Sequence, residues 1–531
     1  MMATVRTLRV LSLLMGILDL VTGSYVRVCY HNTMSFLRES AGKFTPEDIN
    51  PHLCTHLIYS FANVSDNDLT TTNVNDERTA NETGMFERTV SLKKKNPHLK
   101  VLLAVGGWLQ GTSSFVKLVE KESNMRLFAN NTVKFLRDRD FDGFDIDWEY
   151  PGHRGSAPGD KQRFTSLIQI VRETFEGEAL RTGRERLLLT AAVAASQWII
   201  QSSYEVHKIA RNLDYILLMS YDLRGPWNHR LGHHSPLYKR TGESVADSTL
   251  NQDWAVKKWL SMGAPAEKLV MGISLYGRSF TTWWQSNAPK RLGNGCKGGG
   301  IPGEYTNETG ILSYYEICDK IRNEGWIVHR QSEYMVPFAY SDDQFVGYDD
   351  EESVGIKSEY IKTHDLAGAM VWCLDLDDFS GKFCNKGPYP LLRKINSVLR
   401  SGEPQTTNKP TVSTRTGAPT PNPAPVKPTP KETPRQLTPQ KTTTESKLKK
   451  TTVPIPTPKQ TTKSKPVTKP PTTEQRDRIC DVPHSCAHGR FLEDRCNKRC
   501  YYQCVHGTVY HRCCVHGLHW NTKSNTCAFP V

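Results

Sequence analysis

Three acidic residues occupy alternate positions in residues 141–150, which read FDGFDIDWEY. Side chains alternate between the two faces of a β-strand, so Asp145, Asp147 and Glu149 are expected on one face and the intervening apolar residues on the other. Three carboxylates facing a barrel interior are costly to bury, and their mutual repulsion should raise the pKa of at least one of them. A carboxyl group with a raised pKa can act as a general acid near neutral pH. The segment therefore predicts an acid–base site, with Glu149, nearest the C-terminal end of the strand, as the acid.

A calcium site or a group of ion pairs is the alternative explanation for these carboxylates. The segment lacks the turn glycine of a calcium-binding loop, which favours the acid–base interpretation. We expect no metal ion and no other cofactor at this site.

The strand that carries these residues is one of eight short apolar segments separated by stretches of helical periodicity. Several are continuous apolar runs, which is typical of parallel strands covered on both faces. Eight such units within about 375 residues predict an α/β protein with a (β/α)8 TIM barrel. A doubly wound open sheet is the alternative, but the phosphate-binding glycine loop of many such sheets is absent. The expected strands are 25–31, 56–64, 100–107, 141–149, 187–195, 214–222, 269–277 and 366–375.

The last interval between strands is the longest and predicts an α+β insertion at about 278–365, between strands seven and eight. Because the active face of such barrels lies at the C-terminal ends of the strands, the insertion would form one wall of the site. The barrel domain as a whole is expected to span residues 24–400.

The N-terminus has the composition of an export signal. Arg6 and Arg9 precede a short apolar run, and small residues end at Gly23, so residues 1–23 are expected to be a signal peptide. The run is too short to span a bilayer, and no other run is long enough. The sequence predicts a secreted, extracellular protein without a membrane segment.

Composition changes sharply near Ser401. Residues 401–479 hold 16 of the 31 prolines and 15 Lys or Arg against 5 Asp or Glu, so most of the net charge of +13 lies there. Residues 401–478 are therefore predicted to be a disordered linker, either a plain spacer or an O-glycosylated stalk. The near-neutral barrel region makes nucleic acid an improbable ligand.

Residues 479–531 contain eight of the 14 cysteines and are expected to form a small disulfide-rich β domain. A zinc site is the alternative for this region, since several histidines lie there, but the paired C-x-x-C spacing is absent. Four Asn-x-Ser/Thr sequons fit glycosylation of an exported protein, at Asn63, Asn81, Asn130 and Asn307.

The motifs together resemble a known family. DGFDIDWEYPG is similar to the signature of the family-18 glycoside hydrolases, the chitinases, and FAN, GGW, MSYD, YGRSF and AMVWCLDLDDF resemble further segments of that family. The resemblance covers most of residues 25–400 and is greatest to the animal chitotriosidase and acidic-chitinase type.

The resemblance implies hydrolysis with retained configuration and assistance from the substrate. Glu149 would protonate the glycosidic oxygen while the N-acetyl oxygen of the sugar attacks the anomeric carbon. Asp147 would hold the acetamido N–H, Asp145 would hydrogen-bond Asp147, and Tyr221 would contact the acetamido group. Other positions matching family motifs would bind sugar: Phe61, Gly106, Gly107, Trp108, Tyr150, Met219, Asp222, Trp227, Tyr276, Arg278 and Trp372.

The chain departs from the family pattern at three places. Ala104 stands where the family has serine, and Met34 stands near a position that usually carries tryptophan, which puts the outer subsites in doubt. Cys373, directly after Trp372, is also unusual; it could pair with Cys296, or both could be free thiols. The resemblance implies the pairs Cys29–Cys54 and Cys318–Cys384.

The C-terminal region resembles the peritrophin-like chitin-binding module, carbohydrate-binding family 14, in CYYQCVHGTVY and GLHWN. The spacing matches for a Cys504–Cys514 pair, while the remaining connectivity stays open. Four aromatic residues are candidates for stacking on sugar rings, although some must form the core of so small a domain: Tyr501, Tyr502, Tyr510 and Trp520.

These observations predict a secreted, monomeric endo-chitinase that cleaves β-1,4 linkages in chitin and chito-oligosaccharides. The alternatives are a non-catalytic chitin-binding lectin, in which the acid glutamate is typically replaced, and a matrix protein bound to chitin through its C-terminal region.

Overall fold

The computed structural model describes residues 25–283 and 290–401, together with five strands of the C-terminal region. Eight parallel strands form a closed barrel in the order β1-β15-β8-β7-β6-β5-β4-β2, and β1 pairs with β2 to complete the ring. The predicted TIM barrel is therefore confirmed, and an open sheet is excluded because no edge remains among these strands. Their bounds are β1 Val26–Asn32, β2 His56–Ser65, β4 Lys100–Gly106, β5 Gly143–Asp147, β6 Leu188–Ala194, β7 Tyr215–Met219, β8 Leu269–Ser274 and β15 Gly368–Trp372.

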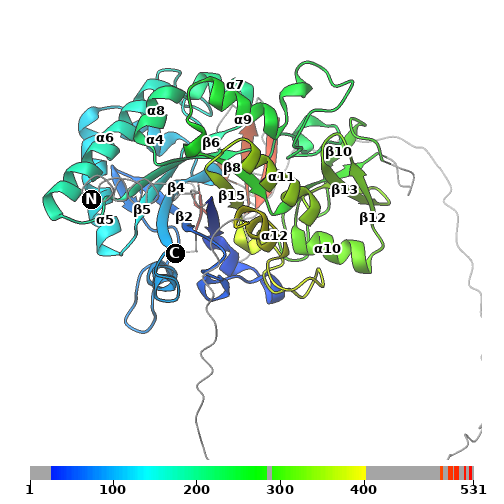
Figure 1. Ribbon diagram of the computed structural model, residues 1–531, viewed down its shortest axis with the longest axis horizontal. Coiled ribbons are helices and arrows are strands. Elements are labelled where there is room, and N and C mark those ends of the chain that lie inside the picture. Colours follow the sequence, from blue (N-terminus) through cyan, green and yellow to red (C-terminus); the bar gives the residue numbers. More distant parts are fainter. Residues whose placement is uncertain are drawn as a thin grey trace, which may run out of the picture. The chain divides into compact units, whose positions relative to one another are not determined.

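Helices cover the outside of the barrel (Figure 1). They are α2 Met85–Val90, α4 Ser113–Leu118, α5 Glu122–Asp138, α6 Asp160–Thr182, α7 Gln197–Ser203, α8 Val206–Asn212, α9 Gln252–Ser261, α11 Glu351–Thr363 and α12 Pro390–Leu399. The one-turn helix α3, Gly107–Gln110, directly follows the C-terminal end of β4. The short strand β3, Asp68–Thr70, extends β2 as a hairpin.

The apolar side chains of the acidic segment pack against these helices. Phe144 lies with its ring centroid 6.0 Å from that of Phe128 on α5. Trp148 stacks on Phe115 of α4 at 5.1 Å and meets Phe164 of α6 edge-on at 6.0 Å. This packing fixes the rotation of β5, so its acidic side chains face the barrel interior, as the alternation predicts.

The insertion between β8 and β15 is an antiparallel sheet with one helix. Its strands are β9 Tyr276–Thr282, β10 Cys296–Gly299, β11 Ile311–Ser313, β12 Ile327–Gln331, β13 Val336–Ser341 and β14 Gln344–Gly347, and its helix is α10 Tyr314–Asn323. The strands and the helix of the insertion span 276–347, inside the predicted interval between strands seven and eight apart from the first residues of β9. Helix α11 packs on β15 and α12, because its buried face completes the barrel layer.

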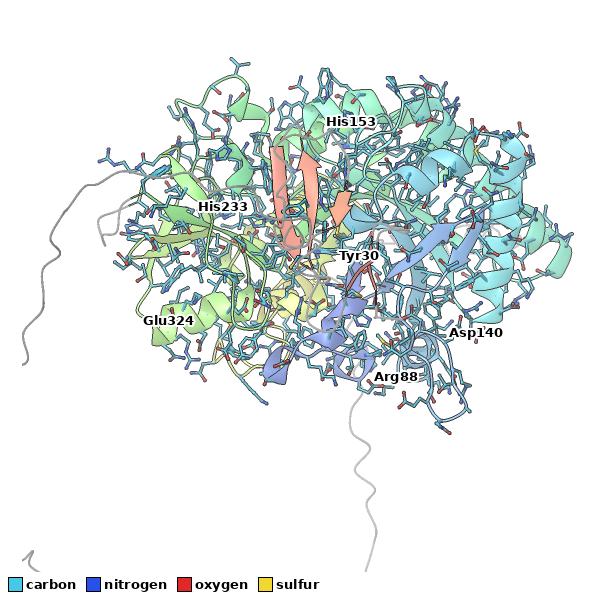
Figure 2. All side chains as sticks on the ribbon, turned by 180° about the vertical axis from the view of Figure 1, so that it is seen from behind. Tyr30, Arg88, Asp140, His153, His233 and Glu324 are labelled. Carbon is cyan, nitrogen blue, oxygen red and sulfur yellow. A yellow bond between two sulfur atoms is a disulfide. The ribbon has the colours of Figure 1, made fainter. Side chains whose placement is uncertain are left out.

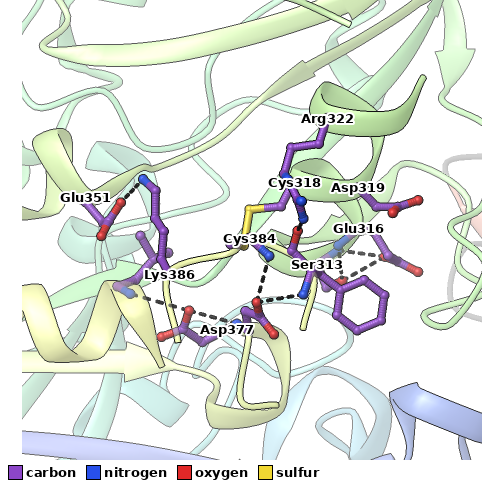
Figure 3. The surroundings of a disulfide bond; sticks show 12 residues. Ser313, Glu316, Cys318, Asp319, Arg322, Glu351, Asp377, Cys384 and Lys386 are labelled. Carbon is purple, nitrogen blue, oxygen red and sulfur yellow. Dashed lines mark hydrogen bonds and ion pairs between the residues drawn. A yellow bond between two sulfur atoms is a disulfide. The ribbon is translucent and has the colours of Figure 1, made fainter. Parts of the chain in front are cut away.

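Two disulfides link segments of the barrel domain and its insertion. Both match the pairs that the family resemblance implies. Cys29–Cys54 links β1 to the segment before β2, and Cys318–Cys384 links α10 to the segment before α12. Around the second bridge, Ser313 and Glu316 cap α10, and Lys386 pairs with Glu351 of α11 (Figure 3).

The suggested Cys296–Cys373 bridge is not formed, and both residues are free, buried thiols. Cys296 packs with Phe280 in the apolar cluster of the insertion, whereas Cys373 belongs to the large cluster of the barrel. The two residues are kept apart because each belongs to a different core.

Only short strands of the C-terminal region are described: β16 Phe491–Glu493, β17 Cys500–Val505, β18 Thr508–Cys513, β19 His519–Asn521 and β20 Thr526–Ala528. On β17, Tyr502 is buried and Tyr501 half-buried, and Cys500 is in a disulfide. The side chains of Tyr510 and Trp520 lie outside the described residues, as does the proposed Cys504–Cys514 pair.

The signal peptide and the linker also lie outside the described residues, so the domain boundaries stay predictions. Within the described part of the chain, no helix is long and apolar enough to cross a membrane. Among the sequon residues, Asn81, Asn130 and Asn307 are exposed, while Asn63 is half-buried on β2.

Candidate active site

Asp145 is the most deeply held of the three carboxylates. It is fully buried on β5, where Tyr30 of β1 donates its hydroxyl to Oδ2 at 2.7 Å and Thr190 of β6 donates to Oδ1 at 2.6 Å. Figure 2 labels Tyr30 on the strand ribbon. Burial raises the pKa of Asp145 to about 6, although both hydrogen bonds act in the opposite direction.

Asp147 is the last residue of β5, and one of its oxygens is unsatisfied. It is almost completely buried, and no described group hydrogen-bonds to Oδ1. Burial, followed by the charges of Glu149 and Asp145, raises the pKa of Asp147 well above its usual range. A buried acceptor without a partner is costly, so this oxygen is well suited to accept an N–H from a ligand.

Glu149 lies two residues beyond the end of β5, at the mouth of the barrel. Burial raises its pKa to about 7, and the charge of Asp222 adds to the rise, while a Tyr150 hydrogen bond and Arg154 lower it. The predicted cause was mutual repulsion of the three carboxylates. Repulsion contributes to the shift at Asp147, but for Glu149 the largest cause is removal from water.

Arg154 is a site residue that the sequence analysis missed. Its guanidinium donates to the backbone carbonyls of Glu149 and Trp108, each at 2.9 Å, and lies 3.6 Å from the centre of the Trp108 ring. Trp108 is 56% exposed, and the guanidinium covers part of its ring. This cation–π contact holds the exposed ring in position. A basic residue five positions after the proposed acid is the only signal in the sequence.

Asp222, from MSYD, is held by a cluster of donors. Arg278 binds it with two hydrogen bonds of 2.7 and 2.5 Å, and the Tyr276 hydroxyl donates at 2.7 Å. Burial alone would raise the pKa of Asp222, but Arg278 holds it well below its usual range. The side chain is 34% exposed and remains accessible to a ligand. His234, also missed from the sequence, lies behind it at 3.4 Å.

Tyr221 lies two residues beyond the end of β7, and Trp372 is the last residue of β15. The Tyr221 hydroxyl contacts the sulfur of Met370 at 3.6 Å, and its ring lies 6.2 Å from that of Tyr276. Trp372, at the end of β15, lies 5.3 Å from Tyr30 and stacks on Phe61 at 5.9 Å. The strand ends therefore bring these predicted residues to one face of the barrel. Met219, half-buried, ends β7 on the same face.

Gly106 and Gly107 are needed for close packing at the end of β4. Both have positive φ, 107° and 75°. A Cβ on Gly106 would lie 2.0 Å from the Asp147 carbonyl oxygen, and one on Gly107 would lie 2.7 Å from the Phe61 ring. Any side chain here would displace either β5 or Phe61. Farther out, Trp227 is 52% exposed, with its ring 5.1 Å from Arg278.

The sequence model described as glycosyl hydrolases family 18 matches residues 26–377, which is the barrel with its insertion. The chain belongs to glycosyl hydrolases family 18. Within the described residues, no group of three or more His, Cys, Asp or Glu is arranged to hold a metal ion.

Relatives in family 18 include both enzymes and proteins of other description. Chitotriosidase-1 of Mus musculus is 47% identical over 372 residues, covering 70% of this chain and 77% of its own length. Chitinase-3-like protein 2 of Homo sapiens is 41% identical over 380 residues, covering 71% and 93%.

Solved structures show the same range. Catalytic domain 2 of the Group II chitinase of Ostrinia furnacalis has a TM-score of 0.66 and 38% identity, covering 72% of this chain and 97% of that one. Human YKL-39, described as a pseudo-chitinase that retains chitooligosaccharide binding, has a TM-score of 0.66 and 40% identity, covering 71% and 99%. Membership of family 18 therefore leaves catalysis to be argued from the site.

At the family-18 departure Ala104, the residue lies opposite Asp145 across β4 and β5. On the other side Asp145 pairs with Thr190 of β6, whose hydroxyl donates to its Oδ1. At the other departure, Met34 is half-buried after β1.

Proposed function

We propose that this protein is a secreted endo-chitinase that hydrolyses β-1,4 linkages between N-acetylglucosamine units with retained configuration. The observation that carries the proposal is the pair Asp147 and Glu149 at the barrel mouth. Burial gives Glu149 a pKa of about 7, so a large fraction of the enzyme holds a proton there at neutral pH.

The first step uses that proton. Glu149 donates it to the glycosidic oxygen, and the bond from this oxygen to the anomeric carbon breaks. The N-acetyl oxygen of the same sugar attacks the anomeric carbon, and a cyclic oxazolinium ion forms. The unsatisfied Oδ1 of Asp147 accepts the acetamido N–H and offsets the positive charge that develops.

Asp145 acts from within the barrel. Tyr30 and Thr190 occupy both of its oxygens and favour its ionised form. The negative charge of ionised Asp145 lies beside Asp147. It helps to keep the charge of the three carboxylates balanced while Glu149 loses its proton. Glu149 then takes a proton from water, which opens the ring by attacking from the face opposite the acetamido oxygen, the face that the departed sugar occupied.

The C-terminal region is proposed to be a peritrophin-like chitin-binding module joined to the barrel by the Pro/Thr/Lys-rich linker. Tyr502 is buried and fits a place in the core of that module, which leaves Tyr501, Tyr510 and Trp520 as its sugar-stacking candidates. Export by the N-terminal signal, a monomeric state, and chitin as partner belong to the same proposal.

A non-catalytic chitin lectin is the second candidate, since YKL-39 is described as a pseudo-chitinase. Turnover of a fluorogenic chitobioside by the wild type and by Glu149→Gln separates the two. The variant keeps the shape of the side chain but has no proton to donate, so kcat should fall about 10²-fold or more while oligosaccharide binding persists.

The same assay, followed by NMR, reports the mechanism. The first product should be the β-anomer, because the cyclic intermediate blocks one face of the sugar. An initial α-anomer would contradict the acetamido route. A wild type that binds chito-oligosaccharide without turnover would support the lectin instead.

A further inference from the structure

His234 lies directly behind the Asp222 carboxylate and is fully buried. Its Nδ1 lies 3.4 Å from Asp222 Oδ1, and its Nε2 lies 3.2 Å from the Tyr276 carbonyl oxygen and 3.3 Å from Ser274 Oγ. The ring also packs on Tyr276, with centroids 4.9 Å apart. The ends of β7 and β8 and the start of β9 therefore enclose one imidazole.

The partners of this imidazole include two groups that can only accept hydrogen bonds. Arg278 keeps Asp222 ionised, and a backbone carbonyl such as that of Tyr276 has no proton to give. A neutral imidazole has a single N–H, so it can satisfy only one of these acceptors. The full charge of Asp222 places that proton on Nδ1, and Nε2 then accepts from the Ser274 hydroxyl.

Uptake of a second proton would complete the arrangement. A proton on Nε2 gives His234 a donor for the Tyr276 carbonyl. Ser274 can release Nε2, because its hydroxyl also lies 3.4 Å from Ser235 Oγ, and Ser235 in turn donates to Asp349 at 2.8 Å. The change of protonation therefore needs only the rotation of a buried hydroxyl.

Burial and the charges around His234 determine its pKa. Burial is the largest cause and holds its pKa below the usual range; Arg278 acts in the same direction, while Asp222 and Asp349 oppose both. The neighbouring ring of His233, labelled in Figure 2, stacks on it at 5.6 Å.

Burial lowers the pKa of His233 to about 3, so its ring stays mostly neutral above that pH. Lys357 of α11 is next to it and is paired with Asp349 at 2.6 Å. No other charged side chain is described in contact with the His234 ring, so its protonation depends on the balance of burial and Arg278 against Asp222 and Asp349.

We propose that His234 is a pH-responsive positioning residue, which fixes Asp222 for sugar binding when neutral and weakens the hold of Asp222 on the sugar when protonated. The physical reason is that an imidazolium draws the carboxylate charge toward itself, leaving a weaker acceptor for the ligand. This inference rests on the proposed function, in which Asp222 binds the sugar.

Two substitutions separate the hydrogen bond that His234 donates from its uptake of a second proton. His234→Ala removes both properties. In His234→Asn the side-chain amide can replace the Nδ1 donor but cannot take up a proton. KM and kcat for a soluble chito-oligosaccharide are measured from pH 4 to 8. His98→Asn, an exposed histidine outside the site, is the matched control.

In the wild type, KM should rise at the acid end while kcat changes little from this cause. His234→Ala should raise KM at pH 7 by about 10-fold, the size of one hydrogen bond to a charged group, and His234→Asn should restore it. Neither variant should show the acid rise in KM, which His98→Asn should keep. An acid rise that persists in His234→Asn would overturn the inference while leaving the proposed function intact.

The proposed function is tested separately by calorimetric binding of the oligosaccharide to Glu149→Gln. If Glu149→Gln does not bind the oligosaccharide and the wild type does not hydrolyse it, the proposed function is wrong. The coupling is still tested by NMR of the histidine Cε1–H signals, where the signal missing in His234→Asn identifies the residue. Asp222→Asn must lower the pKa of His234, because it removes the charge that raises it; an unchanged pKa would refute the coupling.

Discussion

Residue-scale chemistry in this site depends on how differently neighbouring carboxyl groups are treated. Asp222, with Arg278 bound to it, has a pKa held well below its usual range, whereas Glu149 lacks such a partner and has one of about 7. Both are acids in a barrel mouth, and the donors around them decide which one carries a proton. Burial and the charges of Glu149 and Asp145 raise the pKa of Asp147 well above its usual range, and its Oδ1 has no hydrogen-bond partner among the described residues.

Arg154 limits how far the pKa of Glu149 rises. Its positive charge favours the ionised form, so Arg154→Gln should raise the pKa of Glu149. The acid would then stay protonated to higher pH, and the alkaline limb of the kcat profile should move upward. Profiles of the wild type and Arg154→Gln test this, with Arg126→Gln on the surface of α5 as the control. A limb that moves downward would contradict the assignment.

At the scale of elements, Asp145 on β5 depends on hydroxyls from two other strands. The neighbouring strand β6 brings Thr190, which the register places opposite Asp145. Strand β1 does not pair with β5, and its Tyr30 reaches Asp145 across the barrel interior. The sequence places these residues 45 and 115 positions from Asp145, so only the assembled barrel brings them together.

Thr190→Val should therefore impair catalysis without removing any group that touches substrate. The change deletes a hydrogen bond that favours ionised Asp145, so the pKa of Asp145 should rise and kcat should fall by about 10-fold. Thr190→Ser keeps the hydroxyl and should retain most of the activity. Equal kcat values for Val and Ser would mean that this bond has no catalytic role.

At the scale of the whole molecule, buried histidines make the barrel sensitive to acid. Burial lowers the pKa of His31 and His56 to about 4 and that of His233 to about 3. The unfolded chain binds protons on these histidines below about pH 6.5, while the folded protein does not until much lower pH. The free energy of unfolding should thus fall as the pH drops from about 6.5 toward 4.

His31→Phe should reduce this acid loss. Neither ring nitrogen of His31 has a hydrogen-bond partner among the described residues, and the ring packs on Phe44 and Tyr59. Urea unfolding at pH 7 and pH 4 should show a loss smaller than that of the wild type by about 3 kcal/mol, the equivalent of the His31 shift. An identical loss in both proteins would contradict the assignment.

Truncation at about residue 400 tests the division of labour along the chain. The barrel holds every residue assigned to the chemistry, so activity on a soluble trimer should be unchanged. Activity on chitin particles should fall, because a tethered module raises the local concentration of the site at a surface. Trp520→Ala should reproduce part of the loss. An equal ratio of particle to trimer activity in both forms would rule out an anchoring role.

The sequence by itself determined the barrel, the acidic face of its fourth barrel strand and the residues at the strand ends. These follow from local rules: apolar runs separated by helical stretches predict parallel strands, and alternation fixes which side chains share a face. The two disulfides of the barrel domain and the roles of the motif residues were predicted from the family resemblance rather than from such rules. The pattern of α11 does not reveal which layer it joins, and only the structure shows that it packs on β15 and α12.

Tertiary structure alone decided what surrounds each carboxyl group. Arg154, His234, Thr190 and Tyr30 are unremarkable in the sequence, and their roles depend on contacts between distant segments. The pKa of Glu149 likewise comes mainly from burial, which no local pattern encodes. The free thiols Cys296 and Cys373 also depend on tertiary structure. The even number of cysteines in the barrel domain allows them to pair, but the two residues lie in separate apolar cores.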